Sequence, residues 1–272
     1  MRRYEAKQQY ERERMPLFSA LRRYLEVLGA LLRREEENRR QNPLESFVNL
    51  LEPIIMIATL SFMFYFLGRR QVSPLGGPPL LFYSTGFFPL YFFIYISRRM
   101  RGAIDAPQRR FPIEQRLDHI IVHVIMRIID YTVLGIILFG GIYLFFTDQA
   151  IPHNLTPIAW GCLAIIALGF GWGVLTLVLS RTARFWNVVF PAVNRALILF
   201  TGVIFLPDVL APDVRYALSF NPLLHAVQLF RLGFYPQYPA IILDVQYLAY
   251  CAVFALFFGL VLERVTRRFE GR

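Results

Sequence analysis

The spacing of long apolar segments constrains this chain more than any other feature. Six stretches of about 20 mainly apolar residues are separated by polar connections: residues 47–67, 80–97, 120–146, 157–179, 186–206 and 241–262. A helix of about 20 apolar residues is long enough to cross the hydrocarbon core of a bilayer. Hydrophobic residues make up 56% of the sequence and aromatic residues 16%, which is more than a soluble protein needs for its core. The sequence therefore predicts an all-α polytopic membrane protein whose six transmembrane helices occupy residues 47–262.

The basic residues predict how these segments are oriented. Lys and Arg number 23 in residues 1–46, 98–119, 181–184 and 263–272, but only four in the alternate connections, namely Arg69, Arg70, Arg215 and Arg231. Short loops rich in Lys and Arg stay on the cytoplasmic side of a membrane. Both termini are therefore expected in the cytoplasm, with residues 207–240 outside. The net charge of +10 follows these loops rather than forming a single stripe, so we expect no nucleic-acid partner.

The N-terminal 46 residues form a separate, strongly charged segment. They contain no apolar core of a cleavable signal peptide. Within them, residues 17–34 place apolar side chains on one helical face and charged ones on the other. This pattern predicts an amphipathic helix lying on the cytoplasmic membrane surface in contact with lipid head groups, with a soluble helix as the alternative. Residues 263–272 are expected to be a short cytoplasmic tail.

The connection at residues 98–119 is the one inner loop long enough to dock into another protein. It holds six arginines and the hexapeptide Asp105, Ala106, Pro107, Gln108, Arg109 and Arg110. A short charged element ended by proline suits a docking role, but an ordinary positively charged inner loop explains it equally well. Because Lys7 is the only lysine, the chain has no phosphate-binding P-loop. Any ATP that drives it must bind another chain.

Four ionisable residues lie within or near the apolar segments, where they are costly unless they face protein or water. Arg127 and Asp130 have the spacing of an ion pair on one helical face, with a substrate contact as the alternative. Arg195 has no local partner and indicates a polar pathway or a subunit interface. Glu52 is the fourth. His119 and His123 are spaced like a metal pair but lack the intervening glutamate of zinc proteases, so no metal site is predicted. No nucleophile, acid and base set is visible, and no catalytic residue is predicted.

Aromatic residues are concentrated in residues 82–95. Tyr83, Phe87, Phe88, Tyr91 and Tyr95 are candidates for an aromatic face along a substrate passage, because rings with polar tips suit sugars that present both C–H faces and hydroxyls. Packing between helices or contact with lipid is the alternative. Farther along, residues 207–240 contain five prolines and two apolar segments, 214–220 and 223–232, that are too short to cross a bilayer. We expect short re-entrant helices there.

Residues 201–236 resemble the outer connection of the membrane subunits of type-2 ABC exporters, in particular the capsular polysaccharide export permeases. The matching positions are Thr201, Gly202, Val203, Asn221, Pro222, Leu223, His225, Arg231, Gly233 and Phe234. Among them, Asn221, Pro222, His225 and Arg231 are the core of the motif. O-antigen exporters often carry Arg-Asp before the fifth helix, whereas here Phe185 follows Arg184, which favours the capsule branch.

The resemblance implies a permease of the bacterial inner membrane that works as a homodimer with two copies of a cytoplasmic ABC ATPase. ATP and Mg would be bound by the ATPase, with no cofactor in this chain. Residues 105–110 would couple the two proteins. The substrate would be a lipid-linked polysaccharide, passed to a periplasmic co-polymerase and an outer-membrane export protein. Export of O-antigen, teichoic acid or another lipid-linked glycan or small molecule is the alternative, and a secondary transporter or a membrane-embedded enzyme fits less well.

Overall fold

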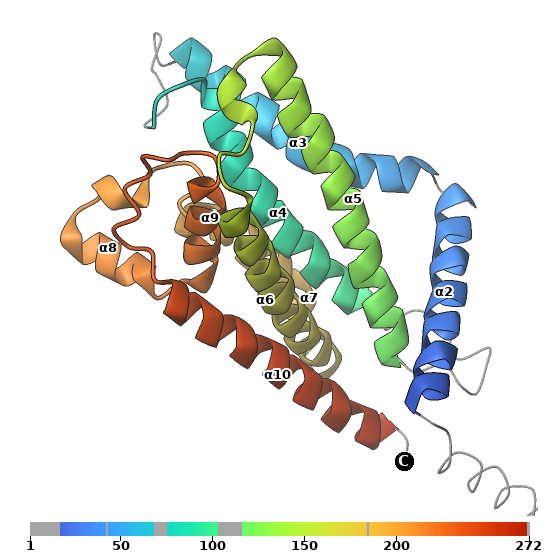
Figure 1. Ribbon diagram of the computed structural model, residues 1–272. Coiled ribbons are helices and arrows are strands. Elements are labelled where there is room, and N and C mark those ends of the chain that lie inside the picture. The colour runs from blue at the N-terminus through green and yellow to red at the C-terminus, as the bar shows by residue number, and fades with distance from the viewer. Residues whose placement is uncertain (1–16, 42, 68–74, 103–115, 184, 271–272) are drawn as a thin grey trace, which may run out of the picture.

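The computed structural model describes residues 17–41, 43–67, 75–102, 116–183 and 185–270. Throughout these ranges the chain is helical or irregular and contains no strand. The helices, shown in Figure 1, are α2 (Leu17–Gln41), α3 (Pro43–Leu67), α4 (Pro79–Gly102), α5 (Arg116–Phe145), α6 (Leu155–Thr182), α7 (Trp186–Phe200), α8 (Pro212–Ser219), α9 (Pro222–Leu232) and α10 (Val245–Glu270), with short 3₁₀ turns η1 (Asp148–Ala150) and η2 (Pro207–Val209). The predicted all-α class is confirmed.

Helix α4 lies at the centre of the bundle. It contacts α3, α5, α6 and α9, and it runs between α5 and α6 in Figure 1. Of its apolar stretch, 94% is buried inside the chain, whereas the corresponding share is 17% for both α5 and α10. Exposed apolar side chains such as Ile136 on α5 and Phe257 on α10 therefore cover the outside of the bundle. An apolar exterior of this kind is what a lipid bilayer requires.

Four helices of the described chain are long and apolar enough to cross a membrane, in the stretches Pro79–Arg98, Ile121–Phe145, Leu155–Ser180 and Val245–Val265. The other two predicted segments also fall on helices, α3 and α7, but their apolar stretches, Leu51–Phe64 and Trp186–Phe200, are shorter. Every predicted segment thus contains a helix. The total of six spans stays a prediction.

Two predicted segment ends were wrong. The fifth segment was expected to run to residue 206, but α7 ends at Phe200, where the Thr201 hydroxyl bonds back to the Leu197 carbonyl at 2.7 Å. Gly202 then takes φ +66°, a conformation that glycine adopts without strain. The sixth segment was expected to begin at residue 241, but α10 begins at Val245, because the Asp244 carboxylate accepts the Tyr247 N–H at 2.8 Å and so caps the helix.

The N-terminal helix α2 packs on the first turns of α5. Leu28 and Leu31 are buried against Val122, and Glu35 Oε1 lies 3.4 Å from His123 Nδ1. Nearby, the Tyr24 hydroxyl donates a hydrogen bond to the Asp118 carboxylate. The pKa of Tyr24 is raised, mainly by burial and further by this carboxylate. Part of the predicted apolar face is therefore used within the protein. The placement of α2 on a membrane surface stays a prediction.

The loop predicted at residues 98–119 is shorter than expected. Helix α4 continues through Gly102, and α5 begins at Arg116. The proposed coupling residues Asp105, Ala106, Pro107, Gln108, Arg109 and Arg110 lie outside the described residues.

Candidate functional site

The connection between α7 and α10 folds into three short helical elements, each of which begins at a proline. Pro207, Pro212 and Pro222 start η2, α8 and α9. Proline suits the first helical position because its fixed φ matches the helix and its missing N–H would have no partner there. The two short helices predicted from residues 214 and 223 are confirmed, with starts two residues and one residue earlier. That they are re-entrant stays a prediction.

Asn221 fastens the start of α9 to the end of α7. Its side-chain oxygen accepts the Leu223 N–H at 3.1 Å, which caps α9. Its amide nitrogen donates to the Phe200 carbonyl at 2.9 Å, a group that the end of α7 leaves without a helical partner. One side chain thus satisfies two helix ends that are 21 residues apart.

Arg231 anchors the other end of α9. It is completely buried, and its two terminal nitrogens donate to the carbonyls of Gly202 and Val203 at 2.8 and 2.9 Å. Its guanidinium carbon lies 4.2 Å from the centre of the Phe82 ring on α4. A buried cation is costly unless it is well bonded, and here two carbonyls and a ring face offset that cost. Gly86 leaves the necessary room, since a Cβ there would lie 2.7 Å from the guanidinium.

Asp208, in η2, joins α9 to the segment that leads into α10. One carboxylate oxygen accepts the Gln228 side-chain amide at 2.9 Å. The other accepts the backbone N–H groups of Ile241 and Ile242 at 2.8 and 3.1 Å. Asp208 is buried, and its carboxylate joins η2 to backbone groups more than 30 positions further along the chain.

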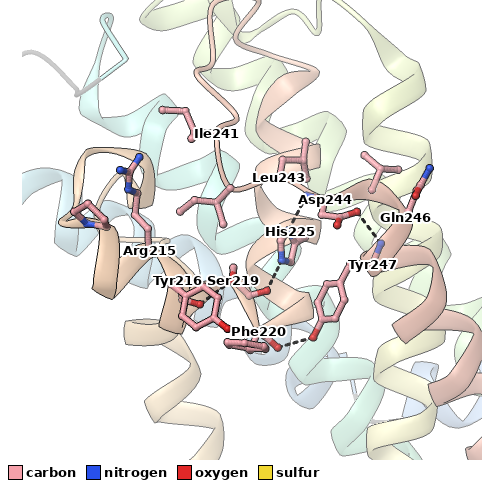
Figure 2. A pocket seen from close by; sticks show the side chains of 13 residues that line it. Arg215, Tyr216, Ser219, Phe220, His225, Ile241, Leu243, Asp244, Gln246 and Tyr247 are labelled. Atoms are coloured by element: carbon pink, nitrogen blue, oxygen red, sulfur yellow. Dashed lines mark hydrogen bonds between the residues drawn. The ribbon is translucent and has the colours of Figure 1, made fainter.

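His225 lies between the end of α8 and the start of α10, as Figure 2 shows. Its Nδ1 accepts the Asp244 N–H at 3.1 Å, and its Nε2 lies 2.7 Å from the Ser219 carbonyl. A ring that accepts at Nδ1 and donates at Nε2 is the neutral tautomer. Neutral His225 therefore bridges two backbone groups, the Ser219 carbonyl before α9 in the chain and the Asp244 N–H after it.

The predicted motif residues Asn221, Pro222, His225 and Arg231 all lie on α9 or directly before it, and three of them, Asn221, His225 and Arg231, connect it to its surroundings. Sequence reasoning missed Asp208, Gln228 and Asp244. A signal for Gln228 was present, because His225, Gln228 and Arg231 follow one another at three-residue intervals and so share a face of α9. All three are buried. We call these three residues with Asp208 and Asn221 the α9 clamp.

The five aromatic candidates for a passage are buried inside the single chain. Phe88 stacks on Phe230 of α9 with ring centres 5.6 Å apart, and Tyr91 lies between Phe87 and Tyr95. Tyr83 stacks on Phe64 of α3. This geometry favours the alternative of helix packing. The role of these residues in a passage stays a prediction.

The ionisable residues of the apolar segments differ in their surroundings. Arg127 and Asp130 form the predicted pair at 3.2 Å. Glu52 of α3 accepts the Tyr95 hydroxyl at 2.5 Å and the Arg98 guanidinium at 3.2 Å, so it ties α3 to the C-terminal part of α4. Arg195 is exposed on α7 and makes no ion pair with any described residue. Groups of three or more residues able to hold a metal are absent from the described part of the chain.

A bundle of long apolar helices with an apolar exterior is the structure of a polytopic α-helical membrane protein. The model of the family described as ABC-2 type transporter matches residues 26–235. The chain therefore belongs to the ABC-2 type transporter family, which agrees with the resemblance seen in residues 201–236.

Curated relatives match over most of their length. Polysialic acid transport protein KpsM of Escherichia coli is 27% identical over 219 residues, which cover 79% of this chain and 83% of KpsM. Capsule polysaccharide export inner-membrane protein CtrC of Neisseria meningitidis serogroup B is 25% identical over 242 residues, which cover 87% of this chain and 89% of CtrC.

Proposed function

We propose that this chain is the membrane subunit of an ATP-driven exporter that carries a lipid-linked capsular polysaccharide across the bacterial inner membrane. The observation that carries the proposal is the similarity to KpsM and CtrC over 83% and 89% of their lengths, which both bear names of polysaccharide transport or export. Since Lys7 is the only lysine, the sequence holds no P-loop, and ATP and Mg would be bound by a separate ATPase subunit.

The passage would lie between two copies of the chain. Arg195 supports this arrangement, because an exposed cation on a mainly apolar helix is costly against lipid and stable against water or protein. Val188, Leu199 and Phe200 on the same helix are also exposed. Helix α7 of one copy would face α7 of the other, with Arg195 beside the polysaccharide.

Coupling to the ATPase would use residues 105–110 and the contact between α2 and α5. Helix α5 begins six residues after Arg110, and α2 packs on its first turns. A movement imposed on the loop by a closing ATPase would therefore reach α5 and α2 together. The chain would cross the membrane six times with both termini in the cytoplasm, and a periplasmic co-polymerase and an outer-membrane protein would receive the polymer.

The proposal is tested by removing the gene from its organism and measuring polysaccharide at the cell surface and inside the cell. We expect surface polysaccharide to disappear and intracellular polymer to accumulate, with both restored when the chain is supplied again. Unchanged surface polysaccharide would contradict the proposal. Accumulation of a different lipid-linked glycan, such as O-antigen or teichoic acid, would assign the chain to that substrate instead.

A further inference from the structure

We propose that a pocket between α8 and the start of α10 is a binding subsite for a sugar ring of the exported polymer, which deepens the proposed function and rests on it. The pocket has a volume of about 830 Å³, and its walls come from α8, the first turn of α9 and residues 241–247. This volume lies within the range of small-molecule sites, about 300 to 1,000 Å³. It is separate from the aromatic residues of α4 and from Arg195.

Three aromatic rings give the pocket a surface suited to sugar. Tyr216 and Phe220 meet edge to face with ring centres 5.1 Å apart, yet they are 70% and 60% exposed. In Figure 2 these two rings lie on the α8 side of the pocket, and the ring of Tyr247 lies on the α10 side. Aromatic rings attract apolar C–H groups to their faces, and phenol groups add polar tips. A sugar ring, with C–H faces and hydroxyls at its edge, matches both properties.

Charged groups border the same space. The Arg215 guanidinium makes no hydrogen bond to any described residue, and Figure 2 places it across the pocket from Tyr247. Asp244 uses one carboxylate oxygen to cap α10 and has the other available to accept. Together they offer a donor and an acceptor to sugar hydroxyls or to the carboxylate of an acidic sugar. An acyl chain would leave both charges unpaired.

The walls of the pocket are held in place before any ligand binds. His225 connects the end of α8 to Asp244, and the Tyr247 hydroxyl donates to the Phe220 carbonyl at 2.8 Å. The two sides of the pocket are therefore linked by side chains that belong to its lining. A site that is already ordered loses less conformational entropy on binding.

The test uses the full chain in phosphatidylcholine nanodiscs and short oligosaccharides cut from the surface polysaccharide of the producing organism. We expect these fragments to bind wild type in microscale thermophoresis. Tyr216→Ala should raise the dissociation constant by about 3- to 10-fold, because a ring face is lost. Arg215→Gln should raise it as well. Tyr250→Ala is the matched control, because Tyr250 is 74% exposed on α10 outside the pocket and its loss should leave binding unchanged.

The subsite is overturned if the fragments do not bind wild type, or if wild type and Tyr216→Ala bind them with equal affinity while the melting temperature is unchanged. Repeating the titration in phosphatidylglycerol nanodiscs separates a lipid head group from a sugar. If that lipid competes with the fragments, the pocket is a head-group site and the proposal fails. Failure of the proposed function is seen separately, as surface polysaccharide that persists after the gene is removed.

Discussion

Arg231 is stabilised by backbone carbonyls and forms no direct salt bridge to a carboxylate of any residue that the structure describes. The Gly202 and Val203 carbonyls that it binds follow the end of α7, where no helical hydrogen bond reaches them. Replacing Arg231 would leave both carbonyls buried without a donor. An unsatisfied buried polar group costs about 1 to 3 kcal/mol, which makes this side chain one of the strongest single contributors to the α9 clamp.

We expect Arg231→Met to destabilise the protein by about 2 kcal/mol or more, because two buried carbonyls lose their partner. Arg231→Lys should recover part of the loss, since an ammonium group cannot reproduce the planar fork that reaches both carbonyls. Thermal unfolding of the purified chain, followed by tryptophan fluorescence, measures the effect. Arg264→Met is the control. Because Arg264 is exposed, the melting temperature of this variant should match that of wild type. Equal stability of Arg231→Met and wild type would contradict the role of this residue.

For Asp208 we expect the choice of replacement to decide the outcome. Asparagine keeps an oxygen for the Ile241 and Ile242 N–H groups, and Gln228 can turn its amide so that its unpaired oxygen accepts from the new side chain. Alanine removes every acceptor. Asp208→Ala should therefore lower the melting temperature clearly more than Asp208→Asn does. The same unfolding assay decides, and an asparagine variant as unstable as the alanine one would show that the negative charge, not the hydrogen bonds, is essential.

Among the elements, the packing of α2 bears on two interpretations of its apolar face, contact with lipid and contact with another helix. Its apolar residues were predicted to contact lipid, yet Leu28 and Leu31 are buried against α5. Leu25 remains exposed and is available for a membrane surface. The helix therefore has one face for protein and another that lipid can cover.

We expect Leu31→Asp to detach α2 from α5, because a buried charge without a partner is costly. Hydrogen exchange of the amides in residues 24–40 should then accelerate in nanodiscs. Leu25→Asp is the matched change on the exposed side of the helix, and it should leave the α5 contact and amide protection intact. If Leu25→Asp accelerates exchange as much as Leu31→Asp does, contact with lipid rather than with α5 holds the helix.

How far the elements could be predicted depends on the range of the interactions that define them. The starts of α8 and α9 depend on local sequence, because Pro212 and Pro222 determine them. Both starts were predicted to within two residues. The end of α7 depends on Gly202, which sequence alone does not distinguish from the other glycines of apolar segments. Asp208 was missed because its partners Ile241 and Ile242 are more than 30 residues away. Tyr91 and Tyr95 show the converse: spacing placed them on one face, but packing decided what that face contacts.

At the scale of the whole molecule, the threading through the membrane can be tested with residues at opposite ends of the bundle. Val209, in η2, is 73% exposed, and Arg264 is exposed near the end of α10. In a chain whose Cys162 and Cys251 are changed to alanine, a membrane-impermeant maleimide should label Val209→Cys in intact spheroplasts. Arg264→Cys should react only after the membrane is opened. The reverse pattern would invert the threading and remove residues 105–110 from the cytoplasm.

The association of two copies is tested at Arg195. If α7 faces its counterpart across a passage, Arg195→Cys in the cysteine-free chain should form a dimer with a short bifunctional maleimide in membranes. Ile136→Cys is the control, since Ile136 is exposed on α5, away from α7. Denaturing electrophoresis measures the yield. Equal yields at both positions would indicate random collisions and contradict a specific α7 interface.

The near-complete burial of α4 has a consequence for biosynthesis. A helix that the ribosome completes early reaches its final surroundings only after α5, α6 and α9 have been made, since all three cover it. Until then its aromatic side chains, with Ser84, Thr85 and Ser97 among them, must be covered by lipid or by an insertion factor. Nascent chains that stop before α6 would therefore be prime substrates for membrane proteases, and the pace of translation between residues 102 and 155 would set how long α4 waits for its partners.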